Sequence, residues 1–181
     1  MKKIKCCGCS ACEQICPKKC IKMVEDEEGY LYPEIDKEKC IECGLCKKVC
    51  PMLNSEKVKQ CNENKFYKFI SKNKKIIEQS SSGGAFSEIT QAIIENNKDK
   101  TYRIYGCVFD ENLTAKHIEV DDINDISVFR KSKYLQSNIR NIYTKVYQNL
   151  KDGLVVIFTG TPCQIAGLKL FLNIKKDVNI E

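Results

Sequence analysis

A doubled cysteine run in the first 51 residues constrains the fold of this chain more than any other feature. The run Cys-x2-Cys-x2-Cys-x3-Cys-Pro occurs at residues 6–17 and again at residues 40–51, at an offset of 34 positions throughout. Eight of the thirteen cysteines fall into it. The spacing of these thiols, more than apolar content, must therefore dictate how this stretch folds.

The spacing is typical of a pair of bacterial 4Fe-4S clusters. Three closely spaced thiolates wrap one cubane, and the fourth cysteine of each run ligates the other cluster. We expect two crossed ligand sets, namely Cys6, Cys9, Cys12 and Cys50 for cluster I, and Cys40, Cys43, Cys46 and Cys16 for cluster II. The proline after each run fixes φ and helps to turn the chain away from the cluster.

A zinc site and a disulfide framework are the alternatives. Zinc ribbons usually separate two Cys-x-x-Cys pairs by a longer stretch. Disulfides need an oxidising compartment, and no signal peptide is visible, so a cytoplasmic protein is expected. A part of this size is too small for a large apolar core, so the clusters should supply much of its folding free energy.

The formal charge of +6 needs correction for the clusters. Each cluster with four thiolates carries about −2, which brings the total to about +2. The lysines are scattered, so a solvated surface explains them and no nucleic-acid partner is expected. Lysines near the clusters can steer an acidic partner, and we expect a redox partner protein or an oxidoreductase subunit. No apolar run approaches the ~20 residues of a membrane span.

The chain divides by composition into an α+β ferredoxin-like double-cluster domain (1–55), a polar linker (56–65) and a partial α/β domain (66–181). A hairpin is predicted from residues 21–24 and 30–32. Strands are predicted over residues 66–70, 103–109, 116–120 and 154–158, the last buried on both faces. Helices are predicted over residues 85–96, 122–129 and 137–150, and from Pro162 onward.

Two loops of the second half have the composition of anion sites. Ser82, Gly83 and Gly84 lead into one predicted helix, and Thr161 to Gln164 lead into another, with Pro162 at its first position. Small residues let backbone N–H groups approach a phosphate at a helix start. A third segment, residues 130–137, offers cations, hydroxyls and an aromatic ring. Each loop alone is more typical of an ordinary capped helix.

Taken together, the segments SSSGGAF, YGCVFD, HIEV, FRKSKYLQS and VIFTGTPCQIAGLK resemble the coenzyme F-420 (deazaflavin) hydrogenase/dehydrogenase beta-subunit family. The resemblance covers nearly the whole chain. It implies an α/β domain that binds a flavin, with FAD as the candidate cofactor, and moves electrons between flavin, clusters and a substrate. The residues that fall on the family's motifs are Ser82, Gly83, Gly84, Lys133, Tyr134, Gln136, Ser137, Thr161, Pro162, Cys163 and Gln164.

The resemblance also sets two expectations about the second half. The two helix starts should face one crevice and share the diphosphate of the flavin. Family members continue past the last motif, whereas this chain ends 12 residues after Lys169, so its α/β domain is expected to be incomplete at the C-terminus. The sequence thus predicts a flavin-dependent iron–sulfur oxidoreductase, and the alternative is a non-enzymatic ferredoxin-type carrier with an incomplete second domain.

Three residues outside the main patterns need an interpretation. Cys7 lies within the first run but off its spacing, and is expected to be a thiol without a cluster role. Cys163 is expected near a helix start, where thiol pKa values fall, as part of a flavin-pocket wall. His117, the only histidine, is expected on the surface of a strand.

Overall fold

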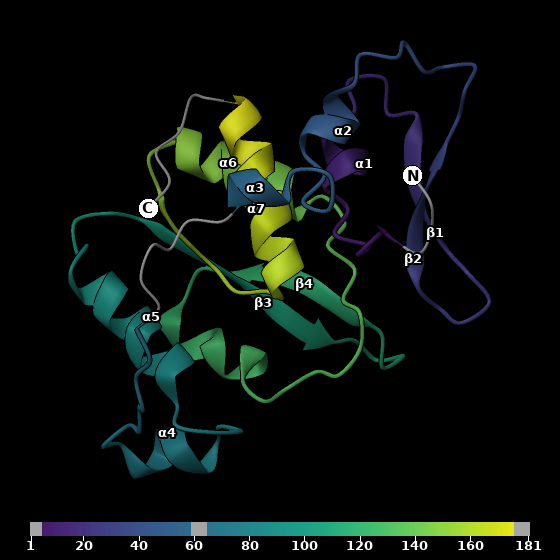
Figure 1. The fold of residues 1–181 in the computed structure, drawn as a ribbon. Coiled ribbons are helices and arrows are strands. Elements are labelled where there is room, and N and C mark those ends of the chain that lie inside the picture. The colour runs from purple at the N-terminus through teal and green to yellow at the C-terminus, as the bar shows by residue number, and fades with distance from the viewer. Residues whose placement is uncertain (1–4, 59–64, 176–181) are drawn as a thin grey trace.

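The computed structural model describes residues 5–58 and 65–175. A cysteine-rich N-terminal part packs beside an α/β part (Figure 1). The elements in chain order are α1 (Ala11–Ile15), β1 (Ile21–Glu25), β2 (Leu31–Ile35), α2 (Leu45–Lys48), α3 (Ser55–Val58), α4 (Lys74–Glu78), α5 (Ala85–Glu95), β3 (Tyr102–Phe109), β4 (Ala115–Val120), the 3-10 helix η2 (Ile123–Phe129), α6 (Ile142–Lys151), β5 (Val155–Phe158) and α7 (Pro162–Lys175).

The two cysteine runs repeat in backbone conformation as well as in sequence. Gly8 and Glu42 are equivalent in the repeat and have φ of 61° and 52°. Ser10 and Gly44 are equivalent too, with φ of 59° and 73°, and each is the N-cap of a short helix, α1 or α2. Left-handed backbone is unfavourable for residues with a Cβ, yet both runs adopt it at the same places. One member of each pair is a glycine, which adopts this conformation readily, and Glu42 and Ser10 follow the same path although they carry a Cβ.

The predicted hairpin between the two runs is confirmed. β1 and β2 pair antiparallel, from Ile21 opposite Ile35 to Glu25 opposite Leu31. The Asp26 carboxylate accepts hydrogen bonds from the backbone N–H groups of Glu28 and Tyr30, at 3.1 and 3.0 Å, which closes the turn.

The α/β part is built on a mixed three-stranded sheet with the order β4-β3-β5. β3 pairs antiparallel with β4 and parallel with β5. β5 therefore lies at an edge, and its side chains are half-buried, so the expectation of a strand buried on both faces was wrong. An apolar run fits a half-covered edge strand as well as a central one, and periodicity cannot separate the two.

Neighbouring side chains of β3 point to opposite faces of the sheet and belong to two different apolar cores. Ile104 packs with Phe129 of η2 and Phe86 of α5 on one face. Tyr105 packs with Phe171 of α7 on the other face. Side chains of a strand alternate between its two faces, so α5 and α7 cover opposite sides of the sheet.

One of these cores also joins the two parts of the molecule. Cys9, Ala11 and Val49 of the cysteine-rich part belong to the same buried cluster as Tyr105 and Phe171. The N-terminal part thus supplements its small apolar content by packing on the sheet and α7. The division into two domains around residues 56–65 stays a prediction.

Five further predictions for the second half are confirmed. They are α5, β3, β4, α7 with Pro162 as its first residue, and a short helix capped by Asp122. The Asp122 carboxylate accepts from the backbone N–H of Asn124 at 2.8 Å. This element is a 3-10 helix, a tighter form that short helices often take.

The helix predicted from Ser137 was wrong in its start, because α6 begins only at Ile142. Asn138 instead forms a parallel bridge to β4. Its N–H donates to the carbonyl of Ala115 at 2.8 Å, and its carbonyl accepts from the N–H of His117 at 3.0 Å. These bonds hold residues 137–138 extended, so the helix cannot start there.

The segment between the two parts also differs from its prediction. The strand expected over residues 66–70 was wrong, since Phe66 and Tyr67 are 92% and 83% exposed and no strand of the described residues pairs with them. Apolar residues alone do not make a strand when no partner edge is in reach. α3 (Ser55–Val58) extends into the polar stretch expected to be a linker (56–65), and residues 59–64 lie outside the described part.

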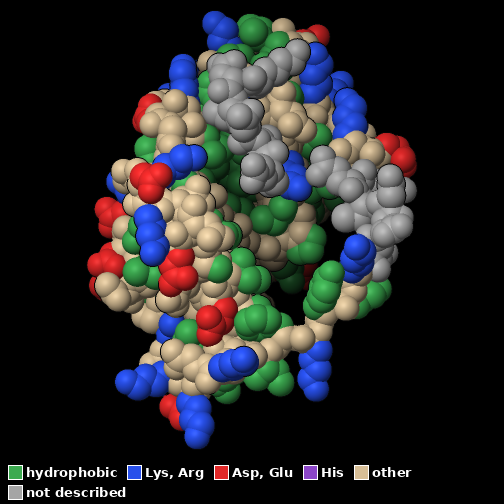
Figure 2. Space-filling model, turned by 90° about the vertical axis from the view of Figure 1, so that its left-hand side faces the viewer, with side chains coloured by type: hydrophobic (Ala, Val, Ile, Leu, Met, Phe, Trp, Pro, Cys, Tyr) green, Lys and Arg blue, Asp and Glu red, His purple; other side chains and the backbone are tan. Residues whose placement is uncertain are grey.

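The surface agrees with the scattered charge of the sequence. On the face in Figure 2, described Lys and Arg side chains lie singly among acidic and polar groups. No helix within residues 5–58 and 65–175 is long and apolar enough to cross a membrane.

Candidate metal centre

A first hollow in the cysteine-rich part is surrounded by the thiols of both runs. Its lining includes three cysteines of the first run and the last cysteine of the second, namely Cys6, Cys9, Cys12 and Cys50. Cys7, Ser10 and Met23 complete the wall. Burial, followed by the negative charge of Cys6, raises the pKa of Cys12 to about 12, and Cys50 adds to this shift.

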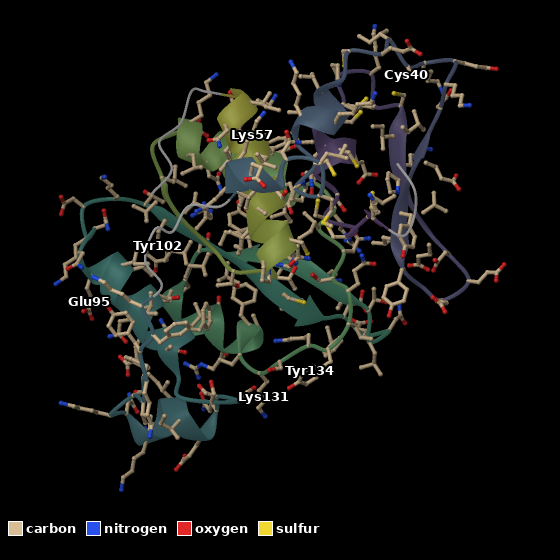
Figure 3. The ribbon with its side chains drawn as sticks, in the orientation of Figure 1. Cys40, Lys57, Glu95, Tyr102, Lys131 and Tyr134 are labelled. Carbon is tan, nitrogen blue, oxygen red and sulfur yellow. The ribbon has the colours of Figure 1, made fainter. Side chains whose placement is uncertain are left out.

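A second hollow is surrounded by the complementary set. Its cysteines include Cys16 of the first run and the first three cysteines of the second, namely Cys16, Cys40, Cys43 and Cys46. Apolar side chains, among them Ile21, Ile35 and Leu45, and charged side chains line the rest. In Figure 3 the sulfur atoms gather around α1 and α2, with Cys40 at the far end.

The fourth cysteine of each run follows a short helix that carries the third. Cys12 lies in α1, and Cys16 is the C-cap residue of that helix. Cys46 lies in α2, and Cys50 comes two residues after that helix ends. The third and fourth cysteines of each run line different hollows.

The donors around both hollows are thiols, the ligands that iron–sulfur clusters take. Within residues 5–58 and 65–175, no three His, Cys, Asp or Glu side chains are arranged to hold one metal ion. The lining of each hollow includes the four thiols of one crossed set, the number that a cubane requires, and one further cysteine. The backbone N–H of Gly8 also donates to the sulfur of Cys6 at 3.4 Å, a contact of the kind that tunes cluster potentials.

Sequence reasoning missed Cys20, which it left as a scattered thiol. Its sulfur lies 3.3 Å from that of Cys16, and its side chain is buried in the wall of the second hollow. Five cysteines therefore surround this hollow. The available signal was the position of Cys20 just before β1, four residues after Cys16, because the strand folds back beside the runs.

The start of α7 lies against the first cysteine run. A Cβ built on Gly167 would lie 3.1 Å from the sulfur of Cys9, so the backbone of α7 touches this loop directly. One turn earlier, interaction with the Cys7 thiol, together with burial, raises the pKa of the Cys163 thiol well above its ordinary value. The expectation that the helix start lowers this pKa was therefore wrong.

The predicted flavin residues do not meet at one crevice. Ser82, Gly83 and Gly84 precede α5, whereas Thr161 to Gln164 begin α7 on the opposite face of the sheet. The expectation that both helix starts share one diphosphate was therefore wrong. The family resemblance aligned the motifs along the chain, but it could not show on which side of the sheet each helix packs.

The two glycines before α5 have a structural explanation. A Cβ on Gly83 would lie 2.0 Å from the carbonyl oxygen of Phe69. Gly84 has φ of 76°, and its Cβ would lie 2.7 Å from Ile76. Packing and a left-handed turn require both glycines, with or without a phosphate.

Ser137 and Gln164, also expected at the flavin, belong to a buried polar network around His117. Gln164 Nε2 donates to Ser137 Oγ at 2.8 Å, and Ser137 Oγ lies 3.0 Å from His117 Nδ1. His117 Nε2 lies 2.9 Å from the carbonyl oxygen of Thr159, and its ring stacks on Phe158. The expectation of a surface histidine was wrong, because β4 turns this side chain inward, where it is 3% exposed.

The segment with the three remaining flavin candidates contacts the loop before α5, where the Ser132 N–H donates to Ser81 Oγ at 3.0 Å, but the candidates themselves point in different directions. Lys133 Nζ donates to the carbonyl oxygens of Val128 and Arg130, at 3.2 and 2.6 Å. Tyr134 is 92% exposed, and Figure 3 shows it with Lys131 on the loop below the sheet. Gln136 points to the other part of the molecule, where its Oε1 accepts from the N–H of Leu31 at 2.7 Å.

Comparison with known protein families agrees with the cysteine geometry. Residues 5–54 match a family model described as a 4Fe-4S dicluster domain, and residues 32–108 match a second model of the same description. No curated protein matches the chain. The resemblance to the coenzyme F-420 family stays a prediction. The dicluster matches support an iron–sulfur electron-transfer role for this chain.

Proposed function

We propose that this protein carries electrons through two 4Fe-4S clusters held by crossed ligand sets. The proposed ligands are Cys6, Cys9, Cys12 and Cys50 for cluster I, and Cys16, Cys40, Cys43 and Cys46 for cluster II. The observation that carries the proposal is the lining of the two hollows, each with three thiols of one run and the fourth of the other. When bound, such clusters accept and release single electrons.

The two ligand sets differ in exposure, which gives the path a direction. Cys9 and Cys50 are buried, and Cys9 belongs to the core shared with α7. Cys43 is exposed, and Ile41 beside it is 57% exposed. Cluster II is therefore the proposed contact with an external redox partner, and cluster I the inner end.

Lysines beside the second hollow fit an acidic partner. Lys18, Lys37 and Lys47 line it, and all three are exposed. Positive charge around an exposed redox site raises the encounter rate with an acidic protein, most strongly at low salt. Replacing Lys18 and Lys37 by Glu should slow reduction by such a protein several-fold, whereas the same change at the distant Lys98 and Lys100 should not.

The direct test is electron delivery. The protein is reduced anaerobically, freed of excess reductant and mixed with oxidised cytochrome c. We expect about two electrons per chain, one from each cluster. Protein with full iron and sulfide content that delivers none would overturn the proposal.

A flavin site in the α/β part is the second candidate function. The observation that favours it is the contact between α7 and the Cys9 loop, since a redox group at the start of α7 would lie close to cluster I. Only this helix start is proposed, because α5 packs on the other face. The test is anaerobic titration with FAD. FAD binding, followed by loss of the flavin absorbance when reduced clusters are present, supports the flavin site. Absence of binding contradicts it and favours the ferredoxin-type carrier.

A further inference from the structure

The segment of residues 65–77 departs from the scattered charge of the rest of the chain. It contains five lysines and no acidic residue. No ion pair joins any of these lysines to an acidic side chain among residues 5–58 and 65–175. The segment therefore carries a local positive charge that no described ion pair neutralises. All five lysines are exposed, namely Lys65, Lys68, Lys72, Lys74 and Lys75.

Large apolar side chains of the same segment are exposed beside the lysines. Phe66 and Tyr67 are 92% and 83% exposed, and Ile70 is 62% exposed. Phe69 keeps 45% of its side chain open as well. Single exposed apolar residues are normal on a protein surface, but a group of them along one short segment marks an interaction site.

The segment is held in place at its base. Ser71 is buried, and its N–H donates to the carbonyl oxygen of Gly83 at 2.8 Å. Its hydroxyl donates to the carboxylate of Glu88 on α5. Ile76 of α4 is buried too. These two inward-facing residues anchor the segment, while its lysines and aromatic rings stay outside the core.

The position of the segment suits a flat binding surface. Figure 1 shows α4 at the lower end of the molecule and α1 and α2 of the cysteine-rich part near its upper end. A surface bound at α4 would therefore leave the second hollow accessible to a redox partner.

We propose that residues 65–77 bind the surface of an anionic membrane, with the lysines at lipid phosphates and the aromatic rings at the headgroup boundary. A lysine close to an anionic leaflet strengthens binding about fivefold. Aromatic and aliphatic side chains add to this when they leave water at the boundary.

Single-stranded nucleic acid is the other partner that takes lysines together with aromatic rings. Proteins that bind it place these side chains along a groove and stack the rings on bases. Here they lie at an end of the molecule, and the exposed aliphatic chain of Ile70 offers no stacking surface. Both observations favour lipid.

The first test is sedimentation of the full chain with lipid vesicles. The protein should bind vesicles of equimolar phosphatidylcholine and phosphatidylglycerol, less strongly as salt is raised, and should not bind phosphatidylcholine alone. Lys72→Gln/Lys74→Gln should weaken binding about 20-fold. Lys98→Gln/Lys100→Gln makes the same change at two exposed lysines outside the segment and should leave binding nearly unchanged.

The second test addresses the apolar contribution. Phe66→Ser should weaken vesicle binding about tenfold. Leu113→Ser is the control, because Leu113 is 73% exposed on the turn between β3 and β4. The chain has no tryptophan, so Phe66→Trp gives a single fluorescent reporter. Its emission should move to shorter wavelength with anionic vesicles, whereas that of Leu113→Trp should not.

Three outcomes would overturn the membrane proposal. They are no binding to anionic vesicles, equal losses in the segment variants and their controls, and binding to single-stranded RNA or an acidic protein in place of vesicles. Vesicle binding does not depend on iron or sulfide, so this proposal and the electron-carrier proposal can fail separately.

Discussion

The backbone N–H of Leu31 donates a hydrogen bond of 2.7 Å to the side-chain oxygen of Gln136, 105 positions along the chain. The amide nitrogen of the same side chain lies so close to Gly8 that a Cβ there would stand 1.9 Å from it. Gln136 thus ties both the hairpin and the first cysteine run to the α/β part. The surroundings of cluster I are therefore built by both parts of the chain.

Gly8→Ala tests this contact. The methyl group would meet Gln136 and, at 2.8 Å, the carbonyl oxygen of Leu31, in a backbone with φ of 61°. The strain and overlap should cost about 2–4 kcal/mol and reduce cluster I content. Gly29→Ala is the control, because φ is 82° there but nothing lies within 4 Å, and it should cost only about 1 kcal/mol. Thermal midpoints and iron content of the two variants measure the difference, and equal losses would contradict the account.

The crossed ligand sets predict which cluster each cysteine holds. Cys50→Ser should remove the signal of cluster I and leave cluster II, although Cys50 belongs to the second run. Cys46→Ser should do the reverse. Paramagnetic resonance of the reduced proteins distinguishes the clusters. If both variants lose the same cluster, the crossed assignment is wrong.

Cys16 and Cys50, the fourth cysteines of the two runs, should differ in how much cluster is lost when each is replaced, because a second thiol, that of Cys20, lies beside Cys16. Its sulfur lies 3.3 Å from that of Cys16, so it can replace this thiolate with little movement. Cys16→Ser should therefore keep most of its cluster II, whereas the double variant Cys16→Ser/Cys20→Ser should lose it. Iron content per chain reports both. Complete loss in the single variant would show that Cys20 cannot serve as a ligand.

His117 predicts a dependence of stability on pH. Burial lowers its pKa, with partial opposition from the Thr159 carbonyl. The unfolded chain binds a proton near pH 6.5 that the folded chain does not, so this contribution is present above pH 6.5 and is lost as the pH falls through the folded pKa. His117→Gln should flatten the change of the unfolding midpoint between about pH 7.5 and 5.5. Lys100→Gln is the surface control, and equal slopes in all three proteins would contradict the prediction.

The sequence predicted those features that depend on local spacing. The cysteine spacing led to two crossed thiol sets, and the structure places the same eight residues around two hollows. The helix α5 and the Asp122 cap could also be predicted from the sequence, since each depends on residues a few positions apart.

Features that depend on long-range packing could not be read in this way. The pattern of residues 137–150 fits a helix, but bonds from Asn138 to β4 delay its start. His117 has the polar neighbours of a surface strand, yet the register of β4 turns it into the core. Which face of the sheet α5 and α7 cover depends on how the chain connects the strands, and no local motif contains that information.

The central claim is tested most directly by the metal content of anaerobically purified protein. The account predicts about eight iron and eight acid-labile sulfide per chain, with two interacting reduced clusters in paramagnetic resonance. Stoichiometric zinc without sulfide would contradict it, since the thiols would then hold single ions in place of the two cubanes proposed for the two hollows.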